Sequence, residues 1–185
     1  MQSNNHSLDS LIAALRKGEF LKFVLFWGHT GLRSGVVGKE CLSQWYPAPF
    51  EIDGLRYSTA EHYMMHRKAI LFSDDATAAK IVTAREPGEA KALGRIVRNF
   101  DETTWRQHRE GIAITGNMAK FSQSPELGAF LRGTRTRVLA EASPVDRIWG
   151  IGLGADDEHA ENPLQWKGLN LLGFSLMEVR RRICS

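Results

Sequence analysis

The sequence is poor in cysteine, in long apolar runs and in net charge, and each shortage excludes a class of protein. Cys41 and Cys184 lie near opposite ends and form no CxxC pair, so neither a disulfide framework nor a zinc ribbon is indicated. The run FVLFWG is far too short to cross a bilayer, and we expect no membrane partner. The formal net charge is only +3, without the lysine- and arginine-rich tract of a nucleic-acid-binding arm.

The remaining composition is that of an ordinary globular protein. Among 185 residues, 43% are hydrophobic and 24% are charged, which suits one domain with a substantial core. Residues 1–20 contain no basic segment followed by an apolar one, as a secretory signal would. We therefore expect a cytoplasmic protein.

Helical patterns dominate the chain. They predict helices over residues 8–17, 59–72, 74–84, 87–97, 101–121, 125–132 and 169–183. Gly18 is in the position that ends the first helix, and Ser124-Pro125 begins the sixth as N-cap and first residue.

Strand signals are few. We expect a buried strand at 20–27, a second at 136–142 and a hairpin around Asp53-Gly54. Strands and helices do not alternate regularly, so the prediction is a predominantly helical α+β domain with a small β-sheet or hairpin. We divide the chain into a helical extension, residues 1–19, and a main domain, residues 20–185.

Two long segments without regular structure, residues 28–47 and 143–168, carry tryptophan, histidine, aspartate and glycine. Long loops in compact domains are often functional. Aromatic planes stack on nucleobases, acidic groups handle protons or sugar hydroxyls, and glycine amides can approach an anion. Trp27 lies at the end of the expected strand, just before the first of these segments. Together the two segments and Trp27 favour a nucleotide-like ligand, which we expect to contact Trp27, His29, Asp146, Trp149, Gly150 and Gly152.

The stretch YSTAEHYMMHRKAILF, residues 57–72, allows three interpretations. In the first, Ser58 and Glu61 form a capping box, and Glu61 only begins a helix. In the second, His62 and His66, one helical turn apart, bind a metal, although Tyr63 occupies the place of the glutamate in HExxH.

The third interpretation uses Glu61 and Lys68. Seven residues make almost two turns, so both side chains share a helix face with their Cα atoms about 10 Å apart. At that distance a carboxylate and an amine can flank a substrate.

Several segments together resemble one known family. LSQWYPAPFEIDGLRYSTAEHYMMHRKAILF, AKALGRIVRNFDETTW, GNMAKFSQSPELGAFLRGT and LAEASPVDRIWGIGLGADD, with GLNLLGFSLMEVR near the end, are similar to the NADAR (NAD- and ADP-ribose-associated) superfamily of YbiA-like N-glycosidases. The similarity runs from about Phe23 to Ile183.

The resemblance implies a mainly helical α+β domain that hydrolyses N-glycosidic bonds. Two substrate classes go with it: phosphorylated ribosylaminopyrimidine intermediates of riboflavin synthesis, and ADP-ribose attached to guanine in nucleic acid. The family's catalytic glutamate and lysine correspond to Glu61 and Lys68, and its acidic loop residue, which we also expect to be catalytic, corresponds to Asp146. Its pocket tryptophans correspond to Trp105 and Trp149.

The segment LSQW departs from the family pattern LSNF, which changes one wall of the expected pocket. Gln44 and Trp45 are the larger residues there. We expect them, with Ser43 and Tyr63, to contact the substrate.

Both substrate classes carry an exocyclic amine on ribose C1, which suits an amine nucleophile. We expect neutral Lys68 to form a Schiff base at C1 while Glu61 shuttles protons. This scheme needs neither cofactor nor metal. Three alternatives stay open: direct activation of water by Glu61, a module that binds ADP-ribose or NAD without cleaving it, and a metal-dependent hydrolase using His62 and His66.

Overall fold

The structure is a computed structural model that describes residues 7–29 and 36–184. Seven α-helices lie within these residues: α1 (Leu8–Arg16), α2 (Ala60–Leu71), α3 (Asp75–Thr83), α4 (Pro87–Arg95), α5 (Glu102–Gln123), α6 (Pro125–Gly133) and α7 (Leu171–Ile183). The described residues also form four strands and two short 3-10 turns: β1 (Phe23–Phe26), β2 (Phe50–Ile52), β3 (Leu55–Tyr57), β4 (Val138–Glu141), η1 (Lys39–Leu42) and η2 (Pro163–Gln165).

Local sequence signals explain where the helices begin. The side chains of Asp74 and Asp101 accept hydrogen bonds from the first turns of α3 and α5, as N-caps do. Pro87 and Pro125 open α4 and α6, where a missing backbone N–H has no cost. The predicted helices are thus confirmed with small changes at their ends.

The hairpin prediction is also confirmed. Strands β2 and β3 pair antiparallel, with Phe50 opposite Tyr57. Asp53 and Gly54 between them both have positive φ, 52° and 76°, as a two-residue turn of this kind requires.

The other sheet joins distant parts of the chain. Strands β1 and β4 pair in parallel, with Phe26 opposite Glu141. The strand predicted at 20–27 is shorter than expected, because only Phe23–Phe26 lie alongside this partner. The end of β1 and the end of β4 therefore lie side by side.

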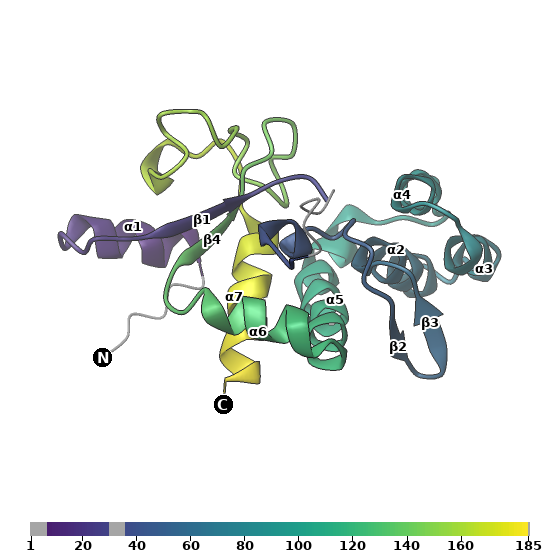
Figure 1. The fold of residues 1–185 in the computed structure, drawn as a ribbon. Coiled ribbons are helices and arrows are strands. Elements are labelled where there is room, and N and C mark those ends of the chain that lie inside the picture. Colours follow the sequence, from purple (N-terminus) through teal and green to yellow (C-terminus); the bar gives the residue numbers. More distant parts are fainter. Residues whose placement is uncertain (1–6, 30–35, 185) are drawn as a thin grey trace.

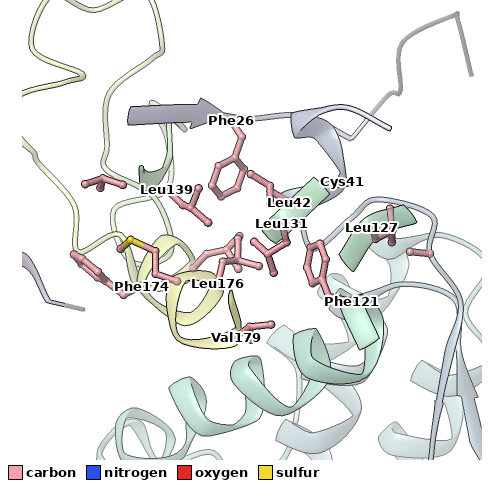
Figure 2. Close-up of a cluster of buried hydrophobic side chains, with 14 of the residues drawn as sticks. Phe26, Cys41, Leu42, Phe121, Leu127, Leu131, Leu139, Phe174, Leu176 and Val179 are labelled. Carbon is pink, nitrogen blue, oxygen red and sulfur yellow. The ribbon is translucent and has the colours of Figure 1, made fainter. Parts of the chain in front are cut away.

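The helices form two groups that meet at α5 (Figure 1). On one side, β1, β4, α6 and α7 enclose a core that includes Phe26, Leu42, Phe121, Leu139 and Leu176 (Figure 2). On the other side, α2, α3 and α4 pack around a second core. Helix α1, which was predicted as an extension, inserts Leu11 into the first core.

The two predicted long loops are compact in the parts that the structure describes. Residues 30–35 of the first lie outside the described residues, and its remainder contains η1. The second contains η2, and its backbone bonds to β4 and to the start of α7. Within residues 7–29 and 36–184, none of the helices combines the length and apolarity needed to cross a bilayer.

Candidate active site

A cavity of about 920 Å³ is lined by segments from both groups of helices. Its walls come from the end of β1, residues 43–45, α2, α4, α5, the end of β4, residues 143–149 and the start of α7: Trp27, Gly28, His29, Ser43, Gln44, Trp45, Glu61, Met64, Met65, Lys68, Lys91, Gly94, Arg95, Trp105, Glu141, Ser143, Val145, Asp146, Arg147, Ile148, Trp149 and Leu172. Ten of the thirteen residues predicted for the site are among them.

The first turn of α2 aims Glu61 at the cavity. The predicted capping box is wrong, because Thr59 rather than Ser58 is the N-cap and its Oγ1 accepts the amide of His62. The amide of Glu61 donates instead to the carbonyl of Gln44 at 3.0 Å. Glu61 is therefore held by the neighbouring wall of the cavity rather than by its own helix start.

The Glu61 side chain is buried, with 3% of its surface exposed. Its Oε1 has no hydrogen-bond partner within the described chain. Burial raises the pKa of Glu61 to about 7; the charge of Asp146 also raises it, and Lys91 opposes the shift. A carboxyl with such a pKa can both give and take a proton near neutral pH.

Lys68 reaches the cavity two turns further along α2. Its Nζ donates to the carbonyl of Gly94 at 2.8 Å and lies 4.2 Å from the centroid of the Phe100 ring and 5.5 Å from that of Trp105. Partial burial lowers the pKa of Lys68. The amine is thus fixed in place and shifted towards its neutral, nucleophilic form.

Helix α5 supports the wall formed by residues 43–45. The Nζ of Lys120, a residue with 1% exposure, donates to the carbonyl of Ser43 at 2.7 Å, and Asn117 Nδ2 donates to Gln44 Oε1 at 2.9 Å. Burial lowers the pKa of Lys120 to about 7. This wall is firmly held, because its contacts are buried hydrogen bonds to a long helix.

Another wall of the cavity, residues 143–149, is shaped by Asp146. Its Oδ1 accepts the amides of Ile148 at 2.9 Å and Trp149 at 2.8 Å, and its own amide donates to Ser143 Oγ at 3.1 Å. Trp149 packs against both cores. Asp146 therefore places Trp149 while its carboxylate adds negative charge beside Glu61.

Three predicted site residues lie elsewhere among the described residues. Tyr63 is buried in a cluster with Phe50 and Tyr57. Gly150 and Gly152 serve backbone packing: a Cβ on Gly150 would lie 2.8 Å from the Glu141 carbonyl oxygen, and Gly152 has φ of +70°. These two glycines allow segments of the backbone to approach each other closely, and they do not line the cavity.

Sequence reasoning did not select Glu141, Lys91 or Arg95, all of which line the cavity. Lys91 and Arg95 stand four residues apart on α4, which puts both cations on one helix face. That spacing was the available signal. Glu141 had none, because its place depends on the pairing of β4 with β1.

The two histidines of α2 are hydrogen-bonded inside the protein. His62 Nδ1 lies 2.8 Å from Thr59 Oγ1, and His62 Nε2 lies 3.2 Å from the carbonyl oxygen of Ala84. His66 Nδ1 lies 3.0 Å from the Tyr57 hydroxyl. Burial lowers the pKa of both histidines. Within the part of the chain that the structure describes, no three histidine, cysteine or acidic side chains gather as metal ligands.

Comparison with known proteins assigns the chain to a family. The model of the NADAR domain matches residues 25–184, so the chain belongs to the NADAR domain family.

Curated relatives share most of the chain. N-glycosidase R617 of Acanthamoeba polyphaga mimivirus is 42% identical over 164 residues, which cover 86% of this chain and 95% of the relative. N-glycosidase YbiA of Escherichia coli strain K12 is 31% identical over 135 residues, covering 73% of this chain and 76% of YbiA. The NMR structure of E. coli YbiA superposes with a TM-score of 0.66 at 27% identity, covering 88% of this chain and 89% of that one.

Proposed function

We propose that this chain is an N-glycosidase that cleaves the C1–N bond between a ribose and the exocyclic amine of a nucleotide. The observation that carries the proposal is the placement of Lys68 and Glu61 on one cavity, both buried enough to shift their pKa towards neutrality. General N-glycosidase activity agrees with the names of the relatives.

In the proposed reaction, Lys68 is the nucleophile. A ribose with an exocyclic amine at C1 can open its ring to an imine, and a neutral amine then attacks C1. The Lys68–C1 bond forms, the base leaves as an amine and water hydrolyses the resulting Schiff base. The hydrogen bond to Gly94 keeps Nζ in one place, and the aromatic rings beside it limit its hydration.

Glu61 supplies the proton transfers. It protonates the leaving amine and later takes a proton from the attacking water. Its buried carboxyl, with one oxygen that accepts no hydrogen bond from the described residues, has an atom available for the substrate.

Aromatic and cationic side chains would hold the rest of the ligand. Trp105 and Trp149 offer planes for the base or the sugar. The sequence leaves the phosphate either to glycine amides of residues 150–154 or to a nearby arginine. We assign it to Arg95 together with Lys91, which place two positive charges on the same cavity.

The physiological ligand is proposed to be either ADP-ribose on guanine or a phosphorylated ribosylaminopyrimidine. A cavity of about 920 Å³ has the size of sites for nucleotide-like ligands.

The free thiols Cys41 and Cys184 support a reducing compartment, as in the cytoplasm.

The test offers both substrate classes to the purified protein and measures released base. We expect turnover of at least one, and borohydride added during turnover should leave a reduced adduct on Lys68. Tight binding of ADP-ribose without base release would instead identify a binding module. Turnover without an adduct, together with an active Lys68→Ala variant, would exclude the Schiff base and leave direct activation of water by Glu61.

A further inference from the structure

Glu141 occupies a fixed position at the end of β4. Its amide donates to Asn170 Oδ1 at 3.0 Å, and its carbonyl accepts the amides of Ser143 and Ile151, each at 2.9 Å. The backbone is thus held from three directions, while the side chain lines the cavity. Such fixation is typical of residues whose side chains must be accurately placed.

The Glu141 carboxyl shares the cavity with other charged groups. Glu61 faces it from α2, Lys91 from α4 and Asp146 from the loop that follows β4. Burial raises the pKa of Glu141 to about 8; Asp146 and Glu61 raise it further, and Lys91 opposes them. Of Glu61 and Glu141, Glu141 is therefore the one better kept protonated at neutral pH.

Glu141 and Glu61 also share an unusual feature. In each side chain one buried oxygen, Oε2 of Glu141 and Oε1 of Glu61, has no partner among residues 7–29 and 36–184. Buried polar atoms in folded proteins are nearly always hydrogen-bonded, and exceptions often mark catalytic sites. Two such oxygens on one cavity indicate that a ligand is meant to bind both.

We propose that Glu141 is a second acid–base residue of this site and divides the two proton transfers of hydrolysis with Glu61. The inference rests on the proposed N-glycosidase function and refines it, because the protonation of the leaving amine passes from Glu61 to Glu141. Glu141 donates its proton to the exocyclic nitrogen as the C1–N bond breaks, and the bonding electron pair stays on that nitrogen. Glu61 accepts a proton from the water whose oxygen attacks C1.

The proton balance of this scheme closes within the pair. Before the reaction Glu141 is neutral and Glu61 is ionised; afterwards Glu141 is ionised and Glu61 is neutral. One proton passing from Glu61 to Glu141 restores the starting state, so the pair holds one proton at the start and at the end of the reaction, while between the two steps that proton is on the departing amine. The products are the free amine of the base and a ribose with a C1 hydroxyl, which together contain the atoms of substrate and water.

Asp146 is less suited to the same role. Its Oδ1 is used to hold the amides of Ile148 and Trp149, so proton transfer there would disturb the loop. Glu141 supports no comparable structure with its side-chain oxygens in the described chain, because its backbone makes the fixing contacts. It can change protonation state without moving the wall.

The test compares Glu141→Gln with Glu61→Gln, using the exposed Glu110→Gln on α5 as a matched control. We expect Glu141→Gln to lower kcat about 100-fold with little change in KM. A substrate whose leaving amine is electron-poor needs less protonation and should recover most of this loss in Glu141→Gln but not in Glu61→Gln. Conversely, borohydride should trap more Lys68 adduct in Glu61→Gln, where hydrolysis of the Schiff base is slowed.

A second measurement does not depend on turnover. Carbon-detected NMR of the side-chain carboxyls should show two groups titrating between about pH 6 and 9 in the unaltered protein and one in each variant. Absence of such groups overturns the inference whatever the activity. If the unaltered protein is active and Glu141→Gln retains full kcat, the inference fails while the proposed function stands; if no base is released from any ribosylamine, the proposed function itself fails.

Discussion

Helix α2 presents two sets of ionisable side chains that differ in how their polar atoms are used. His62 and His66 are buried among hydrogen-bond partners, which they find on the N-cap Thr59, the carbonyl of Ala84 and the hydroxyl of Tyr57. Glu61 and Lys68 face a large cavity, and Glu61 keeps one oxygen without a partner in the described chain. These four polar residues of one twelve-residue helix thus have two different roles, one inside the protein and one at the cavity.

The difference teaches that burial alone does not distinguish a functional polar group from a structural one. All four residues are at least half-buried and have shifted pKa values. What separates Glu61 from the histidines is one buried oxygen that the described residues leave without a hydrogen bond. The histidines hold the helix in place, and the acid and the amine face the cavity.

The strongest test of this contrast removes the amine from the cavity face. Lys68→Met keeps the length and apolar stem of the side chain but has no nucleophile, and we expect base release to fall more than about 10³-fold. Lys80→Met, on the exposed face of α3, is the matched control and should retain full activity. Comparable activity in the two variants would assign Lys68 to the structural set.

The next largest effect is expected for the acid. Glu61→Gln preserves shape but cannot exchange a proton, so kcat should fall about 100-fold or more. Because no cap interaction is lost, the midpoint of thermal unfolding should not decrease. A variant that keeps its kcat but melts at a lower temperature would show that Glu61 is only a device of the helix start.

Removing a buried histidine should lower stability and leave activity nearly unchanged. His62→Ala removes the imidazole that contacts the Ala84 carbonyl and the Thr59 hydroxyl, and we expect a loss of about 2–3 kcal/mol in the free energy of unfolding. Activity per folded molecule should stay within about threefold, also after dialysis against a chelator. Loss of activity that added metal restores would revive the metal interpretation.

The smallest effect concerns pH. Folding raises the pKa of Glu61 from 4.5 to about 7, so the folded state retains a proton that the unfolded chain releases. The stability from this group is complete below about pH 4.5 and is lost as pH rises through 7. In denaturant titrations, the free energy of unfolding of Glu61→Gln should rise relative to that of the unaltered protein by on the order of 2 kcal/mol between pH 4.5 and 8. A constant difference across this range would contradict the buried position of the carboxyl.

The parts of the fold that local sequence determines could be predicted. The helices carry their own N-caps and prolines, and the Asp53-Gly54 turn has the backbone geometry that these residues favour. Even so, the start of α2 was misread by one residue. The amide of Glu61 bonds to Gln44, a contact between segments that no local pattern announces.

The site could be predicted only where chemistry or family resemblance marked a residue. Glu61, Lys68 and Asp146 were marked in this way and lie together on the cavity. Lys91 and Arg95 look like the ordinary charged face of a surface helix, and Glu141 looks like the end of a strand. Their positions follow from tertiary packing, which propensity does not encode.

The parallel pairing of β1 with β4 has a consequence for how the protein comes into being. Five of the seven described α-helices lie between these two strands in the chain, so their pairing closes a very long loop. Contacts of that sequence separation form late and slow the rate of folding. Trp27 follows one strand and Glu141 ends the other, so both reach the cavity only after that closure. During synthesis on the ribosome, the chain should therefore gain its ligand-binding competence only once the segment beyond α6 has emerged.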